Sequence, residues 1–74
     1  MTTSAMTEKV KEFCYRELKN CKEWGGDPQQ ALTRCYGAVM FVLSVEPDED
    51  ESTESLGWWW DNEMHPLFRE LGAN

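Results

Sequence analysis

Apolar residues recur at steps of three and four along three stretches of the chain, a spacing that predicts three amphipathic helices. The first stretch begins after Thr7, a predicted N-cap residue, and ends at the glycine pair Gly25-Gly26, which favours helix termination. Residues 1–6 are predicted to form a flexible leader before this helix. Its apolar stripe contains Val10, Phe13, Cys14, Leu18 and Cys21, and Trp24 follows at the next step of three.

The sequence Asp27-Pro28-Gln29-Gln30 is the clearest local signal in the chain. Aspartate is a strong N-cap residue, proline is favoured at the first helical position, and Gln30 stands where a capping box has Glu or Gln. We expect a second helix to begin here and to end near Val45, because Pro47 blocks its continuation. The short turn between the first two helices makes them an antiparallel pair.

The second predicted helix is apolar over an unusually wide arc. One face carries Leu32, Cys35, Tyr36, Val39, Val42 and Leu43, and Ala38, Met40 and Phe41 cover much of the rest. A helix of this kind is normally covered on several sides, either at the centre of a bundle or by a second copy of the chain. We therefore predict a homodimer through this helix. The alternative is a helix broken at Gly37 with a strand over residues 38–45, but no second strand-like run is present to pair with it.

Residues 46–55 read EPDEDESTES and are predicted to form an acidic loop, with Ser52 or Ser55 as N-cap of the next helix. The third apolar stripe consists of Leu56, Trp59, Trp60, Met64, Leu67, Phe68 and Leu71. Pro66 lies inside it and should kink or split this helix near His65. The expected fold is a single all-α domain over residues 1–74, a compact three-helix bundle formed by a helical hairpin and a proline-kinked C-terminal helix, with four helices if Pro66 splits the last.

Charge is distributed unevenly and narrows the range of partners. Residues 1–45 carry six Lys/Arg and five Asp/Glu, whereas residues 46–74 carry one Lys/Arg and nine Asp/Glu, within a chain of 74 residues and net charge -7. Phosphates of nucleic acids and anionic membrane surfaces are repelled by such a field, so neither partner is expected. The longest uncharged apolar run, Tyr36–Val45, is also far shorter than the roughly 20 residues of a membrane span. A basic protein is the partner that the charge favours.

Three consecutive tryptophans, Trp58-Trp59-Trp60, form the most conspicuous cluster. Because successive helical residues point about 100° apart, Trp59 and Trp60 fit the apolar stripe and Trp58 does not. Trp58 either covers the flank of the bundle, anchors a protein interface, or lines a small-ligand pocket with Trp24. The predicted partner-binding surface consists of Trp58, Met40, Phe41, Asp48, Asp50, Glu51 and Glu54.

No constellation of residues points to catalysis, a metal or a cofactor. A calcium loop beginning at Asp48 would have Thr53 where glycine is required and Trp59 where glutamate is required. Cys14, Cys21 and Cys35 lie on apolar stripes without a zinc-binding spacing, and His65 is the single histidine. We therefore predict buried free thiols, no cofactor and a non-enzymatic protein in the reducing cytoplasm. The alternative function is a small-ligand or metal-binding domain that uses the tryptophans, or the cysteines with His65.

Overall fold

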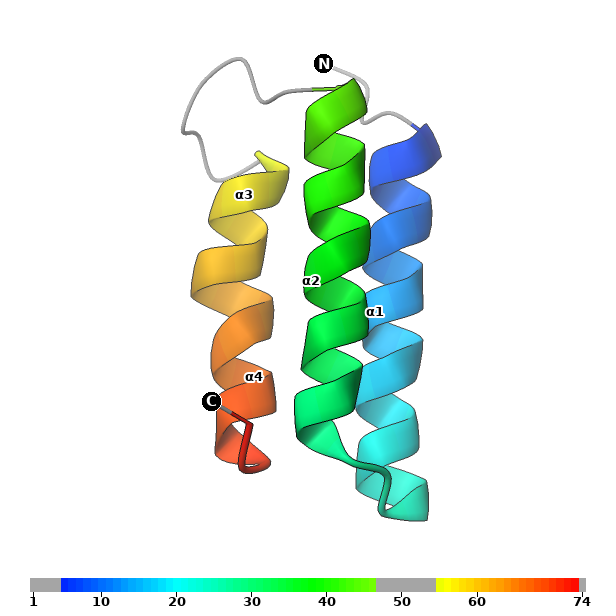
Figure 1. The fold of residues 1–74 in the computed structure, drawn as a ribbon, viewed down its shortest axis with the longest axis vertical. Coiled ribbons are helices and arrows are strands. Elements are labelled where there is room, and N and C mark those ends of the chain that lie inside the picture. Colours follow the sequence, from blue (N-terminus) through cyan, green and yellow to red (C-terminus); the bar gives the residue numbers. More distant parts are fainter. Residues whose placement is uncertain (1–4, 47–54, 74) are drawn as a thin grey trace.

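The computed structural model describes residues 5–46 and 55–73 and shows an all-α fold of three helical columns, without strands in these ranges. Two long helices, α1 (Ala5–Trp24) and α2 (Pro28–Val45), form an antiparallel hairpin. The third column is continuous and consists of α3 (Leu56–Trp59), a π-helical turn η1 (Trp60–Met64) and α4 (His65–Glu70) (Figure 1). The predicted three-helix bundle is therefore confirmed.

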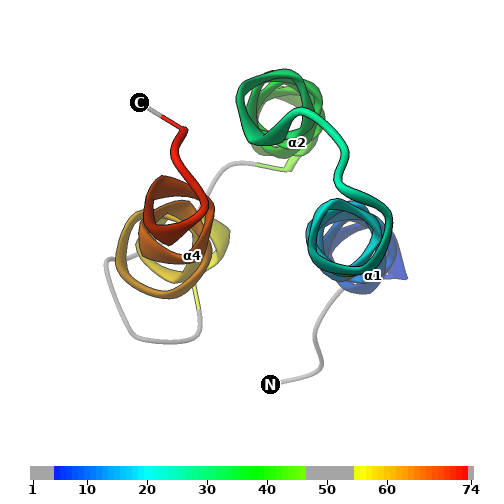
Figure 2. The ribbon, with the colours of Figure 1, turned by 90° about the horizontal axis from the view of Figure 1, so that it is seen from below.

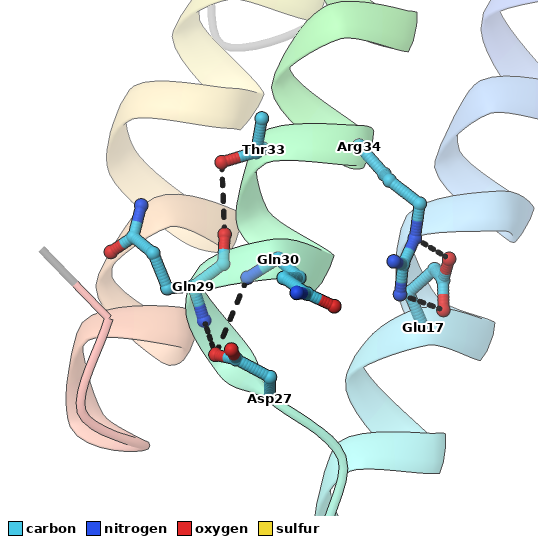
Figure 3. Close-up of polar contacts among 6 residues, drawn as sticks. All are labelled: Glu17, Asp27, Gln29, Gln30, Thr33 and Arg34. Atoms are coloured by element: carbon cyan, nitrogen blue, oxygen red, sulfur yellow. Dashed lines mark hydrogen bonds and ion pairs between the residues drawn. The ribbon is translucent and has the colours of Figure 1, made fainter.

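The turn between α1 and α2 follows the local chemistry of its residues. Gly25 adopts a φ of 69°, in the left-handed region that favours glycine, and this ends α1. Asp27 then caps α2, since its Oδ1 accepts hydrogen bonds from the backbone N–H groups of Gln29 at 2.9 Å and Gln30 at 3.5 Å (Figure 3). The helix continues without a break to Val45, so the alternative strand is wrong.

The beginning of α1 differs from the prediction. Ala5 and Met6 are already helical, so Thr7 lies inside the first turn and is not the N-cap. The predicted leader is therefore too long by these two residues, and residues 1–4 lie outside the described part of the chain. The N-cap preference of threonine was overridden because Ala5 and Met6 are themselves good helix formers.

The end of α1 also differs, because Trp24 is not part of the apolar stripe. Its side chain is 80% exposed. The last turn of α1 extends past the first turn of α2, so that no neighbouring helix covers it (Figure 1).

A π-helical turn explains how the C-terminal column accommodates Pro66. The stripe residues Leu56, Trp60, Met64 and Phe68 are four residues apart, and all are buried. A four-residue step exceeds one turn of an α-helix, which holds 3.6 residues, so this stripe would drift around a regular helix. The wider π turn η1 offsets the drift and ends where α4 begins at His65. The predicted break near His65 is thus a change of helix type within a continuous column.

The three columns form a triangle around the hydrophobic core, and α2 packs against both α1 and the C-terminal column (Figure 2). Buried residues come from all three columns and are Val10, Cys14, Leu18, Ala31, Leu32, Cys35, Val39, Val42, Leu56, Trp59, Trp60, Met64, Phe68 and Ala73. These two neighbours cover only part of the wide apolar arc of α2, since Tyr36, Met40 and Phe41 stay exposed. Within residues 5–46 and 55–73, no helix is both long enough and apolar enough to cross a lipid bilayer.

Candidate interaction surfaces

Trp59 and Trp60 belong to the core, as predicted, and tie the C-terminal column to the hairpin. Each is 4% exposed. The Trp59 ring meets Tyr15 of α1 edge-on at 5.8 Å between centroids, and its Nε1–H donates to the Tyr15 hydroxyl at 3.4 Å. Trp60 packs against Tyr36 of α2 at 6.0 Å and stacks on His65 at 5.9 Å. These contacts explain why two adjacent tryptophans are both buried: each faces a different helix of the hairpin.

Trp58 is half-buried, and its backbone is held at both ends. Its N–H donates to Oγ of the N-cap residue Ser55 at 3.2 Å, and its carbonyl accepts from Nδ2 of Asn62 at 3.0 Å. Ser55 is therefore the N-cap of the C-terminal column, one of the two predicted candidates. Trp58 lies near the start of that column, three residues after Ser55, and the residue is partly exposed.

The structure does not bring Met40 and Phe41 to one surface. Both are exposed, at 45% and 55%, but adjacent helical residues point about 100° apart. Met40 is one turn from Tyr36, which packs on Trp60, so it lies on the flank of α2 that faces the C-terminal column. Phe41 lies on the flank that faces α1. The predicted acidic members Asp48, Asp50, Glu51 and Glu54 fall outside the described residues.

An apolar groove on the outer face of the hairpin was missed by the sequence analysis. We call it the α1/α2 groove; it is open and has a volume of about 420 Å³. Its lining consists of Ala5, Met6, Lys9, Val10, Phe13, Ala38, Phe41 and Val42. The sequence does not display this groove, because it depends on how α1 and α2 lie against each other. With the helix extended to Ala5, Met6 falls on the same face as Val10 and Phe13, at steps of four and three.

Among residues 5–46 and 55–73, the acidic side chains of the C-terminal column form no ion pair with a cationic side chain. Asp61, Glu63 and Glu70 are exposed. The ion pairs of the described ranges, Lys9–Glu12 at 3.8 Å and Arg34–Glu17 at 2.7 Å, both lie within the hairpin. Glu17 also raises the pKa of the Arg34 guanidinium, by hydrogen bond and by charge (Figure 3). Positive charge of the hairpin is thus partly neutralised internally, whereas negative charge of the C-terminal column is available to a partner.

The three cysteines are free thiols, and two of them meet in the core. Cys14 and Cys35 are fully buried, on α1 and α2 respectively, and Cys21 is partly exposed. A hydrogen bond of the protonated Cys35 thiol with Cys14, followed by burial, raises the pKa of Cys35 far above the ordinary thiol value. Burial is also the main cause that raises the pKa of Cys21. A raised pKa favours the protonated thiol, so Cys21 and Cys35 are poor nucleophiles and poor metal ligands.

The geometry does not assemble a metal or ligand site from the predicted residues. Within residues 5–46 and 55–73, no group of three or more His, Cys, Asp or Glu side chains lies close enough to hold an ion. The pocket suggested between Trp24 and the tryptophan cluster is wrong, because α1 ends at the opposite end of the bundle from α3 (Figure 1).

Comparison with known proteins gives no relative. The chain matches no protein-family model, no curated protein and no solved structure at a significant level.

Proposed function

We propose that this chain is a non-enzymatic interaction module, an adaptor or inhibitor, that binds a basic partner protein in the cytoplasm. The observation that carries the proposal is the separation of charge between the two parts of the bundle. The C-terminal column presents Asp61, Glu63 and Glu70 without ion pairs, and it follows an acidic segment in the sequence. A field of this sign attracts a basic protein and accelerates its association.

Trp58 supplies the apolar anchor of the proposed surface. Partly accessible tryptophan is a frequent centre of binding energy, because a large rigid ring loses little conformational entropy when it is covered. The acidic residues Asp48, Asp50, Glu51 and Glu54 precede it in the sequence and provide the polar rim. Met40, exposed on the flank of α2 that faces the same column, extends the apolar part. Phe41 belongs to the other face of the hairpin.

The proposal is tested by affinity capture from a lysate of the source organism, with quantitative mass spectrometry. The variants are Trp58→Ala and a charge-neutral form with Asp48→Asn, Asp50→Asn, Glu51→Gln and Glu54→Gln. A basic protein should be captured by the wild type, and the affinity should fall by roughly 30-fold or more with Trp58→Ala, the effect of losing a hot spot of about 2 kcal/mol. The charge-neutral form should bind more slowly and with a weaker dependence on salt.

Trp24→Ala is the matched control, since Trp24 is an exposed tryptophan at the other end of the bundle. It should retain full capture. Equal capture by all variants, or loss of helical circular dichroism together with loss of binding in Trp58→Ala, would overturn the proposed surface.

A further inference from the structure

We infer that two copies of this chain pair through their α1/α2 grooves, face to face. The predicted homodimer through the second helix becomes, in this form, an interface shared by α1 and α2. It uses the side of the hairpin that the C-terminal column leaves uncovered (Figure 2).

The exposed apolar surface of this face is concentrated near one end. Met6, Phe41 and Val45 are exposed by 39%, 55% and 54%, respectively. Val45 is one helical turn beyond Phe41, and Met6 lines the groove opposite it. A contiguous apolar face of this kind, with a hollow beside protruding side chains, is typical of an interaction site.

The low net charge around the groove favours a second copy of this chain as its occupant. The only charged residue in the lining is Lys9, and its ammonium group is 3.8 Å from the carboxylate of Glu12. Arg16 stands over the Phe13 ring at 5.8 Å. Lys9, Glu12 and Arg16 together give the rim of the groove little net charge, so it attracts neither a strongly basic nor a strongly acidic segment, and the net charge of -7 opposes the acidic one further. A nearly neutral apolar face fits best, and the same face of another copy has these properties.

The same charge distribution fixes how two copies can approach each other. Residues 46–74 hold nine Asp/Glu against one Lys/Arg, so contact through the C-terminal halves is repulsive. Residues 1–45 carry six Lys/Arg and five Asp/Glu, so contact between two hairpins is not electrostatically repulsive. An isologous pair, in which Phe41 of each copy enters the groove of the other, stacks the two hairpins into four helices.

Sedimentation velocity over a concentration series tests this inference on the full chain. The wild type should shift toward twice the monomer mass as concentration rises. Phe41→Glu should remain monomeric at the highest concentration, because each interface would then bury two unpaired carboxylates. Met6→Glu should have the same effect, and it leaves the fold intact because an acidic residue is favoured in the first turn of a helix. Trp24→Glu, an equal change of charge at an exposed aromatic residue outside the groove, should associate like the wild type.

A wild type that stays monomeric throughout, or groove variants that associate as the wild type does, would overturn the inference. Neither result would affect the proposed capture of a basic partner, because none of the residues proposed for that capture lines the groove. Conversely, failure to capture a partner would leave the concentration-dependent mass unchanged.

Discussion

At the scale of single residues, the buried thiols of the core make the free energy of unfolding depend on pH. Cys14 and Cys35 meet between α1 and α2, where both are shielded from water. A thiolate in this place would be desolvated and would lie next to a second sulfur, so the folded chain binds the thiol proton more tightly than the unfolded chain does.

We predict that the free energy of unfolding falls as the pH rises above the ordinary thiol pKa of 9.0. The pKa of Cys35 is raised in the folded state, so its contribution is fully present below that pH and is lost as the unfolded thiol ionises while the folded one stays protonated. The loss is about 1.4 kcal/mol per pH unit for one such thiol. Urea denaturation between pH 8 and pH 10, on the wild type and Cys35→Ala, measures it. The variant should show the shallower dependence, and identical slopes would contradict the prediction.

At the scale of secondary-structure elements, the π turn η1 sets the orientation of the C-terminal column. Pro66 has no N–H, and in a regular helix its ring would clash with the carbonyl four residues earlier. Here it occupies the first turn of α4, directly after η1, where a missing N–H is tolerated. The four-residue spacing of Leu56, Trp60, Met64 and Phe68 independently favours the wider turn.

Pro66→Ala therefore should not stabilise the protein. Removing a strained proline from a helix interior would raise the free energy of unfolding by about 3 kcal/mol. Removing one from a compatible position should instead lower it by about 0.4–1 kcal/mol, because the unfolded chain gains conformational freedom. Urea denaturation distinguishes these signs. The stacking of Trp60 on His65 should persist in the variant, and NMR measures it through the ring-current shifts of His65. Loss of this stacking would show that Pro66 is required for the π turn.

The start of a helix could be predicted from the sequence where a short-range hydrogen bond determines it. Asp27 with Pro28, and Ser55, define helix starts through short-range hydrogen bonds that the sequence displays directly. The start of α1 and the π turn could not be predicted in this way. The start of α1 depends on a close balance between the N-cap preference of Thr7 and the helix propensity of Ala5 and Met6. The π turn depends on the packing of the whole buried stripe against α2, which no short window of sequence contains.

At the scale of the whole molecule, α2 depends on both of its neighbours. Trp60 packs on Tyr36 from one side, while the Cys14 thiol meets Cys35 from another. Most of the stability of a helix in a protein comes from the packing of its apolar face, and a hairpin without the third column would leave much of α2 uncovered.

A fragment of residues 1–46 should therefore have low helicity and unfold without a cooperative transition. Addition of a peptide of residues 47–74 should restore helical circular dichroism and a sigmoidal melting curve, because it returns the buried side chains of Trp59, Trp60, Met64 and Phe68 to the core. Cooperative melting of the fragment alone would show that the hairpin is an independent folding unit.

The candidate surfaces were less predictable than the fold, because a surface combines residues that are distant in sequence. The accessible edge of Trp58 and the burial of Trp59 and Trp60 follow from helical geometry, which the sequence contains. The separation of Met40 from Phe41 follows from the same geometry once the neighbours of α2 are known. The α1/α2 groove required the relative position of two helices and could be identified only from the structure.

Phe13 lines the groove, whereas Tyr15, about 200° further around α1, contacts Trp59, so the groove and the C-terminal column lie on different sides of the hairpin. A pair of chains joined at their grooves would therefore carry its two acidic surfaces outward and far apart. Such a pair is bivalent, and its second binding event on a target with two basic sites is intramolecular. Its overall avidity can then exceed the affinity of one surface by a factor of about 10² to 10⁴ without any new contact, provided that the spacing of the two sites matches. A small chain with one modest surface would in this way discriminate a dimeric or repetitive basic target from a single basic protein.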